Sequence, residues 1–336
     1  MKILYLTAPS CDYLADSVLH GMRSLLGADV VDFPRADVLY RDTGTPLKPR
    51  IHGRGFTCYG LLDDIPVDRY DIEAKVRAGF YDLVVISSIH RQFGWFLQLR
   101  PWLRPDRTIL LDGEDHCAIY PYRGTFWHVP GHRFLPSAHK RYLYFKREWT
   151  PGTVRWRWYK LIPEWLAAKL PAPGNLRTVA FSIPAEKIVS GPPQKAKEFP
   201  RHIVDPEVAA RVPGSAATHV FESEEDYYAD LRASRWGITT KRAGWDCIRH
   251  YEIAASGAVP AFRDLDRKPD TCAPHGLAVG TNVIAYHNWD DLREQTARID
   301  DGRYAELQAG AIAWARRNTT VERAKEILEA FKRAVS

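Results

Sequence analysis

The stretch that decides the fold runs from Trp236 to Pro260 and reads WGITTKRAGWDCIRHYEIAASGAVP. Residues 236–240 are apolar or β-branched and predict a strand, and a basic loop follows them. The next segment has helical spacing and stops at Ser256-Gly257, before a second apolar run over residues 258–262. Strand, loop, helix and strand make a βαβ unit, so the segment predicts a parallel sheet.

The loop and the start of this helix carry groups that suit an anionic ligand. Lys241, Arg242 and Arg249 lie near the expected helix N-terminus, where unpaired N–H groups and the helix dipole favour a phosphate. Glu252 follows within the helix and is placed to accept hydrogen bonds from a ribose. The alternative interpretation is an ordinary amphipathic helix with Glu252 on its solvated face.

This segment resembles the donor-nucleotide site of glycosyltransferases built from two Rossmann-like domains, the GT-B architecture. It is most similar to the group 1 superfamily, in the branch related to spore-maturation glycosyltransferases. The motif Arg-x-(Phe/Tyr)-Glu-x-x-Ala-x-Gly reads RHYEIAASG here over residues 249–257. The resemblance implies that Glu252 contacts the ribose. Relatives carry an earlier glutamate as well, but Gly244 stands at that position and Asp246 is out of register.

Apolar runs alternate with helical patterns along most of the chain, which indicates parallel sheets covered on both faces. We expect an α/β fold of two Rossmann-like domains facing across a cleft. The expected first domain, residues 1–172, binds the acceptor and includes a basic and aromatic inter-domain region at 121–172. Residues 173–336 form the donor domain, with the last helix packing back on the first domain.

The expected strands are 2–8, 28–33, 81–89, 107–111, 179–183, 218–221, 236–240, 258–262 and 282–286. The expected helices are 16–26, 71–78, 93–103, 222–233, 290–299 and 303–332, and the insert at 35–68 is a loop or flap beside the cleft.

Composition narrows the class of protein. The chain has 336 residues, enough for two domains, with 45% hydrophobic and 26% charged residues, as in soluble globular proteins. The formal net charge of +6 favours anionic partners. Five scattered cysteines without a Cys-x-x-Cys pair favour reduced thiols and argue against a zinc site. We therefore expect a cytoplasmic protein without a metal, and peripheral contact with the inner face of the membrane stays open.

A cluster of polar residues follows the expected strand 107–111. Asp112, Glu114, Asp115 and His116 lie where ligands bind in open parallel sheets, beyond the carboxyl ends of the strands. Crowded carboxylates shift each other's pKa, which suits a general base acting on an acceptor hydroxyl. The same cluster also suits coordination of a divalent ion through oxygen. His116 and Asp115 are the first candidates. The alternative is a solvated turn in which Asp112 caps a helix.

Further basic residues are candidates for contacts with anions. Lys146 and Arg147 would face the donor or the acceptor across the cleft, or else lie on a charged helix face. Lys187, early in the second domain, would help to neutralise a diphosphate. Residues 155–160 (RWRWYK) alternate basic and aromatic side chains, which suits nucleic acid, sugar or a membrane surface, or a strand with its tryptophans inward.

Together these features predict a glycosyltransferase of the hexosyltransferase type that uses a UDP- or GDP-sugar. Its acceptor would be a carbohydrate or glycoconjugate in polysaccharide biosynthesis. Two alternatives stay open: a glycosyltransferase that modifies DNA bases, and a protein that binds a sugar nucleotide without catalysis.

Overall fold

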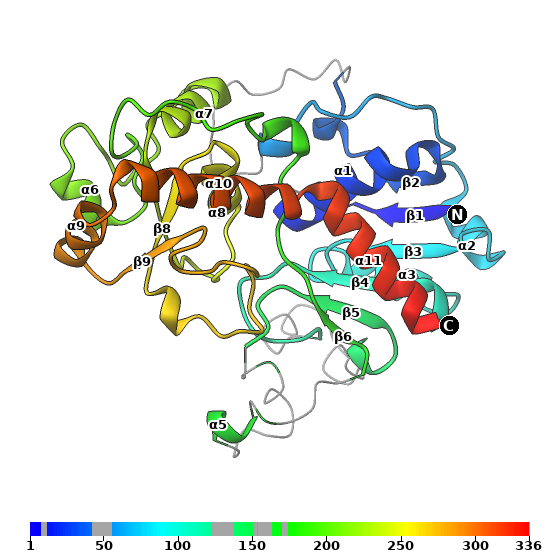
Figure 1. Cartoon of the computed structure of the whole chain (residues 1–336). Helices are drawn as coiled ribbons and strands as arrows, with labels where there is room; N and C mark the ends of the chain where they lie inside the picture. The colour runs from blue at the N-terminus through cyan, green and yellow to red at the C-terminus, as the bar shows by residue number, and fades with distance from the viewer. Residues whose placement is uncertain are drawn as a thin grey trace.

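A parallel sheet of six strands forms the first unit of the computed structural model (Figure 1). The structure describes residues 1–7, 12–41, 56–121, 138–150, 153, 163–167, 169 and 174–335. Among them the strand order is β2-β1-β3-β4-β5-β6. The strands are β1 (Ile3–Leu6), β2 (Val30–Phe33), β3 (Leu83–Ile86), β4 (Thr108–Asp112), β5 (Leu143–Lys146) and β6 (Leu176–Thr178).

Both faces of this sheet are covered, because successive side chains of a strand point to opposite faces. Ile3 and Tyr5 of β1 belong to one buried cluster, and Leu4 and Leu6 belong to another. The first cluster includes apolar residues of α1 (Tyr13–Leu26) and α11 (Thr320–Val335), and the second those of α2 (Ile72–Arg77) and α3 (Phe93–Leu99). The short helix α5 (Glu164–Ala167) lies apart from the sheet (Figure 1).

A second parallel sheet forms the other unit, with the described strands in the order β7-β8-β9. Its strands are β7 (Trp236–Thr240), β8 (Val259–Arg263) and β9 (Ile284–Tyr286). Its helices are α6 (Pro206–Arg211), α7 (Glu224–Ala233), α8 (Ile248–Ala255), α9 (Trp289–Ala297) and α10 (Asp301–Arg317). The βαβ unit expected from residues 236–262 is therefore present as β7-α8-β8. The α/β fold with two parallel-sheet units agrees with the expectation from the sequence.

The C-terminal helix α11 returns to the first unit and packs along α1 (Figure 1). The two helices approach closely at Gly21, where an added Cβ would stand 1.9 Å from the backbone oxygen of Thr320. The imidazole Nδ1 of His20 also lies 2.9 Å from the hydroxyl oxygen of Thr320. Glycine in α1 thus permits the contact that ties the end of the chain to its beginning.

Four expectations about secondary structure differ from the structure. The strand expected at 179–183 is instead β6, Leu176–Thr178, which pairs with β5 in the first sheet. Residues 218–221 form no strand, and the helix expected over 303–332 is divided into α10 and α11 at Asn318-Thr319. Residues 143–146, expected within an inter-domain region, are strand β5 of the first sheet. Residues 155–160 lie outside the described residues.

Within the described part of the chain, none of the helices is both long enough and apolar enough to cross a membrane.

Candidate functional site

A cavity of about 740 Å³ lies between the two units, and we call it the interface cavity. The first unit and the segment after β6 contribute Tyr13, Thr57, Asp115 and Phe181 to its wall. The second unit contributes Arg242, Gly244, Arg249 and Glu252 from the β7-α8 segment, with His202, Glu224, Tyr227 and Tyr228 from neighbouring segments. Arg242, Arg249, Glu252 and Asp115 are therefore four sequence-predicted residues that the fold brings to one cavity.

The N-terminus of α8 forms part of the cavity wall and has no side-chain cap. Cys247 at the N-cap position makes no capping hydrogen bond, whereas Ser223 caps α7 and Asn288 caps α9. The first backbone N–H groups of a helix have no partner within the helix, and the helix dipole adds positive potential there. Because Cys247, Ile248 and Arg249 line the cavity, this end of α8 suits an anionic group.

Arg249 is held in place by His202. A guanidinium only donates hydrogen bonds, so the His202 Nε2 atom, 2.9 Å from Arg249 Nη2, accepts one. The proton of the neutral ring then lies on Nδ1, which is 3.3 Å from the carbonyl oxygen of Ala216. Burial, and next the positive charge of Arg249, lower the pKa of His202 to about 4. His202 thus stays neutral at physiological pH and orients Arg249 in the wall of the cavity.

Glu252 is buried, and each of its carboxylate oxygens accepts one hydrogen bond from a protein hydroxyl. Thr57 donates to Oε1 at 2.5 Å, and Tyr227 donates to Oε2 at 2.8 Å. The alternative interpretation from the sequence, a solvated helix face, is therefore wrong. Thr57 belongs to the insert that was expected beside the cleft, so this insert reaches the helix of the second unit.

Arg147 lies at the junction between the units and is fully buried. Its guanidinium donates to the carboxylate of Asp115, to Glu148 at 2.9 Å and to the backbone oxygen of Asp246 at 2.7 Å. Its Nε donates to the backbone oxygen of Gly113 at 2.9 Å. The expectation that Arg147 faces a ligand is corrected: its donors are used within the protein, and they fix Asp115 at the cavity wall.

Asp112 and Lys146 form a buried ion pair rather than an open binding site. Lys146 Nζ donates to Asp112 at 2.9 Å, and the hydroxyl of Tyr144 donates to the same carboxylate. Both charged side chains are completely buried, because β4 and β5 are interior strands of the sheet. The expectations of a charged helix face for Lys146 and of a solvated turn for Asp112 do not hold.

His116 and Glu114 lie near Asp115 in sequence but do not line the interface cavity. The His116 ring centroid is 6.5 Å from that of His90, and burial, followed by the charge of Lys146, lowers the pKa of His116. Glu114 lies 3.7 Å from the guanidinium of Arg91. Both residues are therefore at the carboxyl end of β4, beside the cavity rather than in its wall.

Lys241 and Lys187 are also absent from the cavity wall. Lys241 is exposed, and its ammonium lies 5.7 Å from the ring centroid of Trp245. Lys187 donates a hydrogen bond of 3.0 Å to Glu224, which does line the cavity. Both cations are thus near the cavity without facing it.

Gly244 occupies the position at which the sequence resemblance implies an earlier glutamate. An added Cβ there would be 2.4 Å from Glu148 Oε1 and 3.0 Å from Asp115 Oδ1. Two carboxylates from the first unit therefore take up the space of a side chain at this position.

The sequence patterns did not indicate three residues of the cavity wall: Thr57, Glu224 and His202. None of them lies in a motif, and each reaches the cavity only through tertiary packing. Glu224 had one local signal, since it directly follows the helix cap Ser223.

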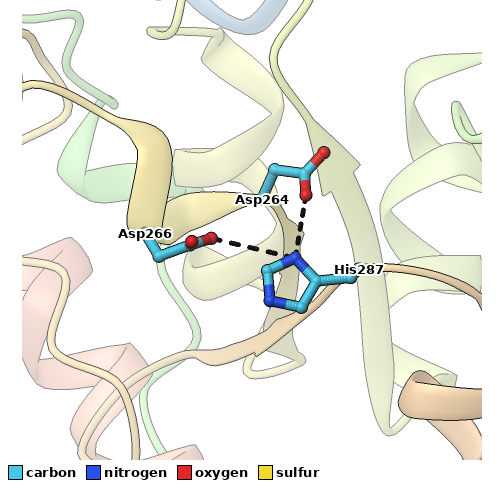
Figure 2. Close-up of side chains that lie close together, drawn as sticks. All are labelled: Asp264, Asp266 and His287. Carbon is cyan, nitrogen blue, oxygen red and sulfur yellow. Dashed lines mark hydrogen bonds and ion pairs between the residues drawn. The ribbon is translucent and has the colours of Figure 1, made fainter.

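A metal site was not expected, and the one group of potential metal ligands found among the described residues lies away from this cavity. Figure 2 shows Asp264, Asp266 and His287, whose potential ligand atoms lie within 4.8 Å of one another. Asp264 and His287 directly follow β8 and β9, and their side chains form an ion pair of 2.9 Å. None of the three lines the interface cavity.

Comparison with known proteins identifies the fold. No protein-family model matches this sequence, and no curated protein matches it. Among solved structures, HepE of Anabaena in complex with UDP and glucose is similar, with a TM-score of 0.55 and 12% identity over 99% of this chain and 100% of that chain. A glycosyltransferase of Rickettsia africae has a TM-score of 0.55 and 8% identity, over 100% and 98%. An alpha-glucosyltransferase in complex with UDP and a DNA containing an HMU base has a TM-score of 0.50 and 10% identity, over 99% of both chains. These structural neighbours are GT-B glycosyltransferases, and at such identities the similarity shows the fold alone.

Proposed function

We propose that this protein is a glycosyltransferase that moves a sugar from a nucleoside diphosphate donor to a hydroxyl acceptor. One observation carries the proposal: a single cavity between two Rossmann-like units joins Arg242, Arg249 and Glu252 at the uncapped start of α8. Cations and free N–H groups suit a diphosphate, and a carboxylate suits ribose hydroxyls. The GT-B fold, with neighbours that bind UDP or UDP-glucose, supports the same assignment.

In the proposed donor complex, Arg242, Arg249 and the α8 N–H groups surround the diphosphate. Negative charge develops on the diphosphate as the bond to the sugar breaks, and preorganised positive groups stabilise that charge in the transition state. Lys241 and Lys187 add positive potential from outside the cavity wall. Glu252 binds the ribose once the Thr57 hydroxyl has moved away from Oε1. This scheme requires no metal ion.

We place the acceptor against the first unit, near Asp115. The acceptor oxygen attacks the anomeric carbon, the carbon–oxygen bond to the diphosphate breaks, and a protein base receives the hydroxyl proton. Asp115 lines the cavity and is the first candidate for that base; His116, whose lowered pKa favours the neutral form, is the second. Glu114 and Asp112 are weaker candidates for the base, since neither lines the cavity and the Asp112 carboxylate is buried in an ion pair with Lys146.

Finer assignments belong to the same proposal. The donor is a UDP- or GDP-sugar, the transferred group is a hexose, and the setting is cytoplasmic polysaccharide or glycoconjugate synthesis. The expected boundary after residue 172 moves, because β6 belongs to the first sheet: we place the acceptor domain at residues 1–178, with the donor domain following it up to residue 336. The family assignment that we propose is the branch of spore-maturation glycosyltransferases. A DNA acceptor is the second candidate, supported by the net charge of +6 and by the neighbour bound to DNA.

The test is nucleotide binding by the folded protein, measured by calorimetry and by thermal stability with UDP, GDP, CDP and ADP and their sugars. A ligand that binds only the folded state raises the melting temperature. We expect one nucleoside diphosphate to bind, and Arg249→Ala and Glu252→Ala to lose that binding. Arg298→Ala is the matched control, because Arg298 is an exposed arginine of the same unit. Failure of every nucleotide to bind the folded protein would overturn the proposal.

A further inference from the structure

Three carboxylates of the second unit line the interface cavity, and they differ in their hydrogen bonds. Asp246 accepts from the Phe181 N–H at 2.7 Å and from the Tyr251 hydroxyl at 3.0 Å. Glu252 is satisfied, because Thr57 and Tyr227 each donate to one of its oxygens. A ligand hydroxyl that binds Glu252 must share an oxygen with one of these partners or displace it. The motif that singled out Glu252 therefore identifies a carboxylate that is already occupied.

Glu224 has the opposite character. Lys187 donates to its Oε2 at 3.0 Å, but its Oε1 is buried and has no hydrogen-bond partner among the described residues. Leaving a buried acceptor without a donor costs free energy, and more so for a charged group. Burial, and to a lesser extent the charge of Glu252, raise the pKa of Glu224, while the ammonium of Lys187 lowers it. Among the described carboxylates in this wall of the cavity, Glu224 thus has an oxygen without a hydrogen-bond donor.

The surroundings of Glu224 indicate what kind of ligand group it would accept. A carboxylate repels phosphate, so a diphosphate belongs at the other end of this wall, with Arg242 and Arg249. The ring of Tyr228 lies beside both carboxylates: Thr57 Oγ1 is 3.3 Å from the Tyr228 hydroxyl, and Lys187 Nζ is 5.6 Å from its ring centroid. Neutral hydroxyl groups are the donors that suit two adjacent carboxylates on such a surface.

We propose that Glu224 is a second donor-site carboxylate, which accepts a hydrogen bond from a ribose hydroxyl of the bound nucleotide. Lys187 acts as a positioning residue that fixes the other oxygen of Glu224 and keeps the carboxylate ionised. This inference rests on the proposed function and adds a ribose-binding residue that lies outside the β7-α8-β8 segment.

The test crosses protein variants with modified nucleotides. Calorimetry would measure binding of the preferred nucleoside diphosphate and of its 2′-deoxy and 3′-deoxy forms to the wild type, Glu224→Ala and Glu224→Gln. Glu225→Gln is the matched control, because it is the exposed neighbour of Glu224 on the same turn of α7. Melting temperatures and circular dichroism would confirm that each variant is folded.

We expect the wild type to bind the ribonucleotide about tenfold or more tightly than at least one deoxy form, as for a hydrogen bond to a charged group. In Glu224→Ala the ratio of the dissociation constants, deoxy form over ribonucleotide, falls to about one. In Glu224→Gln this ratio is intermediate, and in Glu225→Gln it is unchanged. An unchanged ratio in folded Glu224→Ala, or a change in preference for the base alone, would overturn the inference. No nucleotide binding by the wild type would instead overturn the proposed function and this assignment with it.

Discussion

The hydroxyl of Thr57 donates a hydrogen bond of 2.5 Å to Glu252 Oε1, although 195 positions separate the two residues in the chain. Thr57 lies in the short 3₁₀ turn Phe56–Cys58 of the first unit, and Glu252 lies in α8 of the second. The protein thus supplies, from its own first unit, the kind of group that a ribose would present. In the proposed donor complex, the Thr57 hydroxyl and the ribose would therefore compete for the same carboxylate oxygen.

Removing the Thr57 hydroxyl should therefore strengthen nucleotide binding. Thr57→Val keeps the shape of the side chain but deletes the competing donor, so we expect a several-fold lower dissociation constant for the nucleoside diphosphate, measured by calorimetry. Thr57→Ser retains the hydroxyl and should behave like the wild type. Weaker binding by Thr57→Val would mean that Thr57 supports the ligand rather than competing with it.

Arg147 should prove essential for stability. Its guanidinium is buried among Asp115, Glu148 and the backbone of Asp246, so Arg147→Met leaves buried carboxylate charge without its partner. We expect a loss of about 3–5 kcal/mol in the free energy of unfolding, measured with urea. In Arg104→Ala, which breaks an exposed pair with Asp106, the free energy of unfolding should change far less, because solvent screens that pair. Similar losses in the two variants would contradict the structural importance of Arg147.

Gly244 should not tolerate a side chain. In Gly244→Ala the new Cβ would overlap Glu148 Oε1, which is itself held by Arg147 and by the backbone N–H of Asp246. We expect a destabilisation of about 1–3 kcal/mol, together with weaker nucleotide binding, because the two units can no longer meet as closely. Gly94→Ala is the control, since nothing lies within 4 Å of its added Cβ. Equal stability of Gly244→Ala and the wild type would show that Glu148 can move aside.

His250 should make the protein less stable in acid. The ring is buried, stacks on Phe262, accepts from the Thr239 hydroxyl at 2.8 Å and donates to the Trp245 oxygen at 2.9 Å. Burial lowers its pKa from 6.5 to about 4. Between these values the unfolded chain binds a proton that the folded protein does not, so stability falls as the pH falls. The loss should approach roughly 3 kcal/mol near pH 4.

Urea unfolding at pH 7, 5.5 and 4.5 would measure this effect. His250→Gln cannot gain the proton, so its stability should depend less steeply on pH over this range, whatever its stability at pH 7. In His287→Gln the loss in acid should remain, because His287 is exposed and hydrogen-bonded to Asp264, which raises its pKa. A pH dependence of His250→Gln identical to that of the wild type would refute the assignment.

The secondary-structure predictions that the structure confirms are those that rest on a strong local sequence pattern. Strand β7 and helix α8 were expected from an unbroken apolar run and from helical spacing, and the structure has both. The break between α10 and α11 was missed because helical spacing continues through Asn318-Thr319. It is a tertiary feature: Ile183 and Thr319 form a β-bridge there, and Asn318 donates to the Trp314 oxygen.

The candidate site was predictable where a motif lies in one continuous segment. Arg242, Arg249 and Glu252 come from one loop and one helix, so their proximity follows from local structure alone. Lys146 and Arg147 were expected to face a ligand, because a run of basic and aromatic residues does not reveal that its strand lies inside a sheet. Which charges are buried depends on the carboxylates that the neighbouring strand presents to them.

The sequence by itself determined the α/β alternation, the βαβ unit and the cations at the start of α8, since each is a matter of spacing along the chain. Only the tertiary structure decided which side chains bond to the charged groups: Thr57 donates to Glu252, Lys187 to Glu224 and Arg147 to Asp115. These contacts join segments far apart in the chain, and they form where apolar packing of the two units brings their polar ends together. Local patterns encode helices and strands, but the state of a charged side chain depends on what the folded chain places beside it.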